Sequence, residues 1–403
     1  MQIVWVSRSR ERTPLPFFIQ LCSETLYLYI PRPSLPFSHP RTLEQQQSTM
    51  SSNNAPTIAI TGINGFIATE VALIFISNGW HVRGSVRTHA QVETLKAHPA
   101  YAKYFASGVL RAVVVEDLTK SDLSELFDGV QAVASLAAPL PSRDPSVTWK
   151  DFKIQSIEPA LRILKHAQKA NTIKSVIITS SNASALDIIG GAPGKVYTED
   201  DWNPLTEEYC QSLDLATNPM TPAIWYFAAK KLTEQAVLEF QDTEKPPFSI
   251  TILCPSMVCG PANYIDTTQA FKDRRGVPSN QILNIFVGKD QPLPMKLACA
   301  FVDVRDVAAA FYAAATKQVS GRFMLSGHEF VDKLRALRPD LDAYFPLGEP
   351  GKDVPGDWAV DASKSKKEFG LQYRSTEDTL KDTVNYLESI GLFKEAPAGL
   401  KTA

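Results

Sequence analysis

From residue 57 onward, short apolar runs alternate with longer stretches of helical periodicity. Thr57–Thr61 is such a run, and a strongly apolar helix is predicted over Phe66–Ser77 and a long helix over about Asp151–Lys169. Strands that alternate with helices form βαβ units with right-handed crossovers. The pattern therefore predicts an α/β fold with a doubly wound parallel sheet. The predicted strands cover residues 57–61, 81–87, 110–115, 130–137, 173–179 and 249–253.

After residue 262 the strict alternation is lost, and a smaller mixed domain is expected. Residues 264–300 are irregular apart from one short apolar helix near 280–287. Asp303 begins an alanine-rich helix that reaches about Thr316, and Ser375 begins a final helix that ends by Gly391. We expect the helix at 303–316 to return to the main sheet and the other pieces to form a substrate domain.

The first 49 residues differ in composition from the rest of the chain. They contain no lysine and no glycine but six prolines, and no hydrophobic period is sustained. Met50 begins a lead-in typical of a soluble enzyme, so we expect a disordered extension or an upstream mis-start before it. The predicted units are the extension at 1–49, a dinucleotide-binding domain at 50–262, the substrate domain at 263–394 and a loose tail at 395–403.

Composition and charge exclude several classes of partner. A formal net charge of -2 provides no basic surface for nucleic acid. No uninterrupted apolar run reaches the roughly 18 residues that a membrane span needs. The five cysteines and six histidines are scattered without metal-ligand spacing. We therefore expect no metal site and a reducing, cytoplasmic location.

The residues between the first strand and its helix fit a dinucleotide fingerprint. Gly62 permits the tight turn, Gly65 lets the backbone approach a pyrophosphate, and Ala68 allows the helix to pack closely on the strand. The helix N-terminus then faces the phosphates. An ordinary strand-turn-helix with glycines is the alternative, but the context favours a Rossmann-like NAD(P)-binding site. Further cofactor contacts are expected from Asn64, Phe66, Ile67 and Ala137.

The end of the second strand distinguishes the two dinucleotides. An NAD site usually places Asp or Glu there to hold the ribose hydroxyls. Residues 82–88 contain Arg83 and Arg87 but no acid. Because guanidinium pairs with a 2′-phosphate and carboxylate repels it, NADP(H) is favoured over the alternative of solvated arginines. Asp117, next to Leu118 after the third strand, is a candidate acceptor for the adenine amino group.

Candidate catalytic groups lie on one helix and one strand end. Tyr226 and Lys230 are one turn apart on the same helix face, and Thr221–Pro222 is the predicted start of that helix. The lysine ammonium would stabilise the tyrosine phenolate, so Tyr226 can exchange a proton while Lys230 holds the nicotinamide ribose. A surface Tyr and Lys are the alternative. Hydroxyls in Thr179–Ser181 end the fifth strand at the ligand-binding edge of the sheet.

Other residues are candidates for the walls of the site. Residues 254–261 follow the sixth strand, and their backbone is placed to orient the nicotinamide carboxamide through Pro255 and Val258. A long loop is predicted over 186–222, and long loops at a sheet edge often line sites. Core packing is the commoner role of large side chains, but four are candidates for substrate contact: Trp202, Trp225, Met257 and Phe286.

Residues 57 to about 390 resemble the extended short-chain dehydrogenase/reductase family, whose members are related to NAD-dependent epimerases and dehydratases. Within it they are most similar to NADPH-dependent carbonyl reductases and dihydroflavonol 4-reductase-like enzymes. The matching motifs are TGxxGxxA at 61–68, TSS at 179–181, YxxxK at 226–230, PSxVxGP at 255–261 and FVDVRDVA at 301–308.

This resemblance implies hydride transfer from NADPH to the carbonyl of an aldehyde or ketone. In that family the catalytic serine corresponds to Ser181 rather than Ser180, Tyr226 donates the proton, and Arg87 contacts the 2′-phosphate. We expect a small-molecule carbonyl substrate and a monomer or homodimer.

Two departures from the family pattern lie near the expected cofactor. Pro159–Ala160 stands where Gly-Thr is usual, which predicts a kink in that helix, and Ala229 stands where serine is common.

Other functions on the same fold stay open. They are a hydroxysteroid dehydrogenase, a sugar-nucleotide epimerase or dehydratase, and a non-enzymatic NAD(P)-sensing regulator. Dehydratases place acids after the strand-five hydroxyl, whereas Asn182 and Ala183 follow it here.

Overall fold

The computed structural model describes residues 55–139, 144–191, 194–267, 300–327, 340 and 358–394. Four of the sequence predictions therefore lie outside the described residues. They are the extension at 1–49, the helix near 280–287, the substrate contact of Phe286 and the tail at 395–403.

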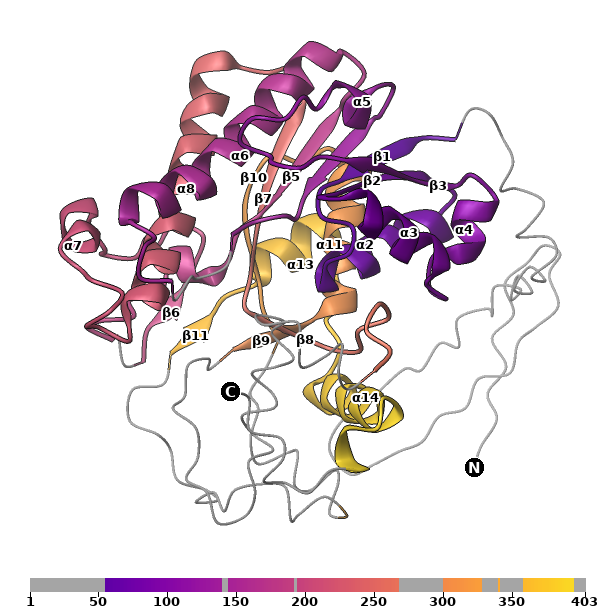
Figure 1. Ribbon diagram of the computed structural model, residues 1–403. Helices are drawn as coiled ribbons and strands as arrows, with labels where there is room; N and C mark the ends of the chain where they lie inside the picture. Colours follow the sequence, from indigo (N-terminus) through magenta and orange to yellow (C-terminus); the bar gives the residue numbers. More distant parts are fainter. Residues whose placement is uncertain are drawn as a thin grey trace, which may run out of the picture. The chain divides into compact units, whose positions relative to one another are not determined.

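Seven parallel strands form the central sheet, in the order β10-β7-β5-β4-β1-β2-β3 (Figure 1). The winding direction reverses between β1 and β4, which pair side by side with Ile58 opposite Ala132. The doubly wound parallel sheet is thus confirmed, and its switch point lies between these two strands. The strands are β1 (Thr57–Ile60), β2 (His81–Val86), β3 (Leu110–Val114), β4 (Ala132–Ser135), β5 (Ser175–Thr179), β7 (Ser249–Pro255) and β10 (Gly321–Leu325).

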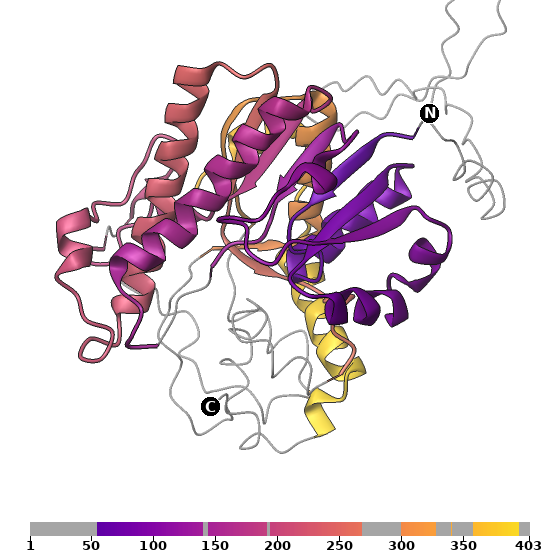
Figure 2. The same ribbon diagram turned by 45° about the horizontal axis from the view of Figure 1, so that its top comes forward.

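Helices cover both faces of this sheet (Figures 1 and 2). On one face α6 (Trp149–Ala170) and α8 (Thr221–Glu244) pack against each other, and on the other α2 (Phe66–Ser77) packs against α11 (Val304–Lys317). Side chains of a strand alternate between faces, so Val176 and Ile178 of β5 join the core under α6 and α8. The helix predicted at 303–316 is α11, and it lies against the main sheet.

Shorter elements complete the described chain. α3 (His89–Ala97), α4 (Ala102–Ala106) and α5 (Ser124–Phe127) accompany the first half of the sheet, and α13 (Ser363–Phe369) and α14 (Thr376–Ser389) follow its last strand. Two small parallel pairs join β6 (Val196–Tyr197) to β11 (Ala359–Val360) and β8 (Met257–Cys259) to β9 (Phe301–Asp303). The remaining elements are α7 (Glu207–Gln211) and the 3-10 turns η1 (Asn182–Ser184) and η3 (Leu392–Lys394).

Three predicted helix starts can be compared with the structure. Asp303 caps α11 by accepting from the Arg305 N–H, and Ser375 caps α14 by accepting from the Asp378 N–H. The prediction of Thr221 as the N-cap of α8 is wrong by one residue, because Met220 is the N-cap and Thr221 is the first helical residue. The Thr221 hydroxyl donates to the Asp214 carbonyl and does not cap the helix.

The loop predicted over 186–222 contains β6 and α7, so that prediction is also wrong in part. α6 continues through Pro159 without a break from Trp149 to Ala170. None of the helices in the described part of the chain is long and apolar enough to cross a membrane.

Candidate active site

The loop after β1, residues 61–65, is here called the glycine loop, and it is closely packed at both of its glycines. Gly62 has a φ of +66°, and a Cβ added there would lie 3.1 Å from the Ala137 Cβ. A Cβ on Gly65 would lie 3.1 Å from the Gly62 carbonyl oxygen. Gly65 is also the N-cap of α2 and provides no side-chain cap, so the first amides of this helix are left for another acceptor. The loop therefore has the form that a pyrophosphate requires.

Neighbouring elements hold this loop in place. The Tyr101 hydroxyl donates to the Ile63 carbonyl (3.0 Å), and the Ser85 hydroxyl accepts from the Gly62 N–H (3.2 Å). Gly84 of β2 leaves room for the Ile63 side chain, since a Cβ there would come within 2.4 Å of it. The Thr61 hydroxyl accepts from the backbone N–H groups of residues 136 and 137, which links the loop to the end of β4.

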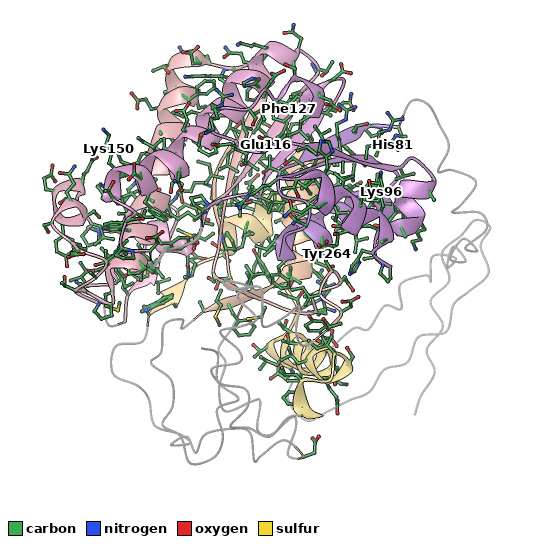
Figure 3. The ribbon with its side chains drawn as sticks, in the orientation of Figure 1. His81, Lys96, Glu116, Phe127, Lys150 and Tyr264 are labelled. Atoms are coloured by element: carbon green, nitrogen blue, oxygen red, sulfur yellow. The ribbon has the colours of Figure 1, made fainter. Side chains whose placement is uncertain are left out.

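Residues far along the chain, at 263 and 264, also pack beside this loop. The ring of Tyr264 packs against those of His98 (centroids 4.4 Å apart) and Tyr101 (5.7 Å). The neighbouring Asn263 amide donates to the carboxylate of Glu70 on α2 (2.6 Å). Burial raises the pKa of Glu70, although this hydrogen bond acts in the opposite direction. The segment after β8 thus packs beside the glycine loop, where Figure 3 labels Tyr264 close to α2.

The two arginines near the end of β2 have different surroundings. The Arg83 guanidinium donates to the carbonyls of Glu125 (2.9 Å) and Asp128 (2.5 Å), so it fastens β2 to the α5 region. Arg87 is exposed, and its guanidinium has no hydrogen bond or ion pair within the described residues. Arg87 is therefore the arginine that is available to an anion at this edge.

Asp117 lies in a local turn after β3. One carboxylate oxygen accepts from the hydroxyl (2.6 Å) and the N–H of Thr119 (2.8 Å), and the other lies 3.2 Å from the Lys120 ammonium. The hydrogen bonds from Thr119 are the main reason why the pKa of Asp117 is lowered to about 2. The carboxylate is ionised at neutral pH and can accept a further hydrogen bond. The adjacent Leu118 packs on the core beneath.

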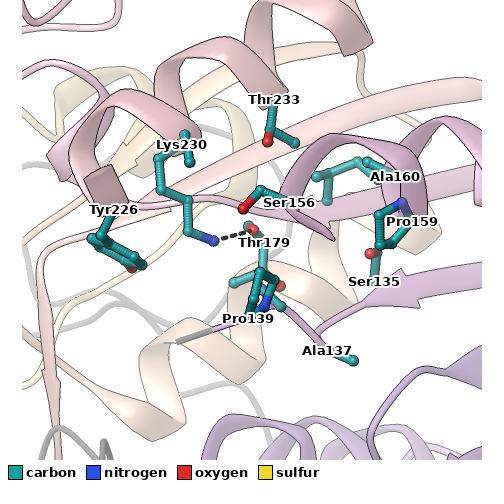
Figure 4. Close-up of a pocket in the computed structure, with 13 residues that line it drawn as sticks. Ser135, Ala137, Pro139, Ser156, Pro159, Ala160, Thr179, Tyr226, Lys230 and Thr233 are labelled. Carbon is teal, nitrogen blue, oxygen red and sulfur yellow. Dashed lines mark hydrogen bonds between the residues drawn. The ribbon is translucent and has the colours of Figure 1, made fainter. Parts of the chain in front are cut away.

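Tyr226 and Lys230 face a common pocket from α8 (Figure 4). The Lys230 ammonium donates to the Thr179 carbonyl at the end of β5 (3.3 Å) and lies 5.6 Å from the centre of the Tyr226 ring. The Thr179 hydroxyl is buried and has no hydrogen-bond partner among the described residues. The pocket is lined by Ser135, Ala137, Ala138, Pro139, Ser156, Pro159, Ala160, Ile178, Thr179, Tyr226, Ala229, Lys230 and Thr233.

This pocket joins the two ends of the site. Ala137 lines it and also lies against Gly62 of the glycine loop. The sequence did not single out Ser135, Ser156 or Thr233 as pocket residues. Thr233 lies three residues after Lys230, and this spacing places both on one helix face. The sequence therefore contained the information needed to predict Thr233 as a pocket residue.

The two serines after β5 have different environments. The Ser180 hydroxyl is buried and donates to the carboxylate of Glu234. The Ser181 side chain is half-buried, and its hydroxyl oxygen accepts from the Ala183 N–H (3.2 Å) as the cap of η1. Of these two serines, only Ser181 has a hydroxyl that is not hydrogen-bonded to a buried carboxylate.

The aromatic wall candidates separate into two groups. Trp225 is buried, donates to the Cys210 carbonyl (2.9 Å) and packs against Trp149 and Phe152, so it belongs to the core behind the site. Trp202 is half-buried, and the Arg322 guanidinium lies over its ring, with Cζ 4.1 Å from the ring centre.

The segment after β7 contributes the remaining candidates. Met257 is half-buried at the start of β8, between the buried residues Pro255 and Val258. Across the described ranges, no cluster of His, Cys, Asp and Glu is arranged to hold a metal ion.

Related proteins are known both in sequence and in structure. A family model described as the NAD dependent epimerase/dehydratase family matches residues 58–325. A putative uncharacterized oxidoreductase of Schizosaccharomyces pombe is 32% identical over 348 residues, which cover 82% of this chain and 96% of the relative. The ketoreductase azaE of Aspergillus niger is 27% identical over 345 residues, which cover 82% of this chain and 97% of that protein.

Among solved structures, the crystal structure of the yeast methylglyoxal/isovaleraldehyde reductase Gre2 complexed with NADPH is similar. It superposes with a TM-score of 0.70 at 26% sequence identity. The match covers 84% of this chain and 99% of Gre2.

The link between Thr61 and the end of β4 generates a prediction. Replacing Thr61 by Val keeps the shape but removes the acceptor of two backbone N–H groups. We expect the free energy of unfolding, measured in urea, to fall by about 1–3 kcal/mol. Thr69→Val is the matched control because the Thr69 hydroxyl donates to the Gly65 carbonyl, which already accepts the Thr69 N–H. Equal losses in both variants would contradict a special role of the Thr61 hydroxyl.

Proposed function

Because the chain belongs to the NAD dependent epimerase/dehydratase family, we propose that it is an NADPH-dependent reductase that converts the carbonyl of an aldehyde or ketone to an alcohol. The observation that carries the proposal is the shared pocket of Tyr226 and Lys230, which meets the glycine loop through Ala137. The related ketoreductase and the NADPH complex of Gre2 support the same reaction class.

The residues present fit the dinucleotide. The close approach of Ala137 and the positive φ disfavour a side chain at residue 62, and the amides at the start of α2 have no side-chain cap. We assign the backbone around these amides to the pyrophosphate and Arg87 to the 2′-phosphate. Further contacts of NADPH are proposed at Asn64, Gly65, Phe66, Ile67, Asp117, Leu118, Pro255 and Val258.

Three side chains carry the chemistry of reduction. When bound, NADPH supplies the hydride to the carbonyl carbon. The Ser181 hydroxyl donates a hydrogen bond to the carbonyl oxygen, and the Tyr226 hydroxyl transfers its proton to that oxygen, so the product is a neutral alcohol. The Lys230 ammonium stabilises the phenolate left on Tyr226 and holds a ribose hydroxyl of the cofactor.

The substrate is proposed to enter between Trp202 and Met257. Both are half-buried, whereas Trp225 of α8 is turned toward Trp149 and Phe152 of α6 and shapes the wall without reaching the substrate carbonyl. No carboxylate lines the described pocket, and Asn182 and Ala183 follow Ser181. This lining supports reduction over dehydration, which needs an acid at that place.

Cellular location and assembly stay predictions. Cys210, Cys254 and Cys259 are free and buried in the described structure. This supports the proposal of a reducing, cytoplasmic location. A monomer or homodimer is proposed on the sequence reasoning alone.

The reaction class is tested by following NADPH absorbance with a panel of small aldehydes and ketones that includes methylglyoxal and isovaleraldehyde. We expect substrate-dependent oxidation of NADPH with one alcohol formed per NADPH consumed. A sugar nucleotide with NAD serves as the comparison for the epimerase alternative. Turnover of the sugar nucleotide alone would overturn the proposal.

Tyr226→Phe removes only the proton donor. We expect kcat to fall by about 10²–10⁴-fold while the Kd of NADPH, measured by fluorescence titration, changes less than about twofold. Tyr209→Phe is the control because Tyr209 is an exposed residue of α7. Retention of full activity in Tyr226→Phe would remove this tyrosine as the donor.

Arg87→Ala removes the exposed guanidinium. We expect the Kd of NADPH to rise by about 10–100-fold, the range of a lost charge-assisted hydrogen bond, and that of NADH to change little. Arg83→Ala is the matched control, since Arg83 binds two backbone carbonyls and its loss should lower stability without altering the NADPH-to-NADH ratio. Equal weakening of both cofactors by Arg87→Ala would contradict the 2′-phosphate contact.

A further inference from the structure

A buried ion pair lies directly behind the candidate active site. Glu234 follows Lys230 by one turn and Tyr226 by two turns on α8, and its side chain is fully buried. Arg322 comes from β10, the edge strand of the sheet, and its side chain is 5% exposed. The Arg322 Nε donates to Glu234 Oε2 at 2.5 Å. Two elements far apart in sequence are thus joined by opposite charges that water does not reach.

The remaining donors of Arg322 bind the segments around the site. Its Nη1 donates to the carbonyls of Glu199 (2.5 Å) and Asp201 (2.7 Å), and its Nη2 donates to the Ser184 hydroxyl (2.7 Å). The guanidinium plane also stacks on Trp202, with Cζ 4.1 Å from the ring centre. One side chain therefore fixes both the η1 turn and the segment that carries Trp202.

These contacts hold the backbone of Ser181 from both sides. The preceding residue, Ser180, donates its hydroxyl to Glu234 Oε1. On the other side, the Ser184 hydroxyl accepts from Arg322 and donates to the Ser181 carbonyl (2.8 Å). Ser181 is thereby connected to the ion pair through its neighbour and through its own carbonyl.

Stability alone does not account for the arrangement. Removing two charges from water costs several kcal/mol for each ion, and a buried pair often contributes little net stability. What such a pair does provide is fixed geometry, because every donor of a planar guanidinium has a defined direction. Here four of these directions are used at once, on Glu234, Ser184 and two carbonyls.

We propose that Glu234 and Arg322 are positioning residues of the reduction, which fix the Ser181 hydroxyl and the Trp202 ring at the carbonyl substrate without touching substrate or cofactor. This inference rests on the proposed reductase function. A displacement of a reacting group by about 1 Å can cost about 10²-fold in rate. Loosening the Ser181 turn should therefore slow the chemical step while the glycine loop and Arg87, on the other side of the switch point, are unchanged.

Ser184→Ala tests this most directly because it cuts the link from Arg322 to the Ser181 carbonyl and leaves the ion pair in place. We expect kcat for a carbonyl substrate to fall by about 10-fold, with the KM and Kd of NADPH changed by less than about twofold. The isotope effect on kcat with NADPH deuterated at both C4 positions should increase, since the hydride step becomes more limiting. Ser365→Ala is the matched control, a buried serine with two hydrogen bonds in and beside α13.

The outcomes separate a positioning role from a structural one. A loss of kcat that matches the fraction of NADPH-binding protein, with an unchanged isotope effect, would overturn the inference, as would wild-type kcat in Ser184→Ala. Arg322→Lys keeps the charge but not the planar fork, so it should give the same kinetic pattern as Ser184→Ala. If the unaltered protein binds NADPH but reduces no carbonyl, the proposed function fails first, and that result is distinguishable because it needs no variant.

Discussion

The buried pairing of Glu234 with Arg322 is the constraint on which the positions of the Ser181 turn and of Trp202 depend. A charge inside a protein is tolerated only when its partners and hydrogen bonds are all in place. Burial by itself would lower the pKa of Arg322, but the charge attraction and hydrogen bond of Glu234 act together with the contribution of Cys254, and the pKa is raised. The pair can therefore form only when β10, α8, the η1 turn and the segment at 199–202 have all assembled, so the ion pair couples the completion of the sheet to the completion of the site.

The nucleotide half depends on steric exclusion instead of charge. Gly62 is held against Ala137, Gly84 gives way to Ile63, and the Thr61 hydroxyl joins the loop to β4. Such contacts define how closely a backbone can approach a ligand. Because all seven strands are parallel, this crowded loop after β1 and the Ser181 turn after β5 lie at the same carboxyl edge of the sheet. Steric exclusion thus shapes one part of this edge, and the buried ion pair holds another.

Much of this arrangement could be predicted from sequence because its signals are local. Six of the seven strands of the central sheet, the span of α2 and the caps of α11 and α14 follow from apolar periods and capping residues. β10 was missed because Arg322 interrupts its apolar pattern, and the charge is acceptable only through Glu234, 88 residues away in sequence. β6 and β11 are two residues each and exist only through pairing with each other. No local signal could separate Arg83 from Arg87, since the distinction lies in the carbonyls that Arg83 reaches on the α5 region.

The departures from the family pattern all lie at the same pocket. Its lining includes Pro159, Ala160 and Ala229, so the two hydroxyls expected from the family pattern at residues 160 and 229 are absent here. Other hydroxyl-bearing residues line the same pocket: Ser156 and Thr233 on the same two helices, and Ser135 and Thr179 at the ends of β4 and β5. The ammonium itself is held by the Thr179 carbonyl, a backbone group that no substitution at Ala160 or Ala229 removes. The position of Lys230 therefore depends on the end of β5 and on the register of α8, and α8 is fixed one turn further along by Glu234.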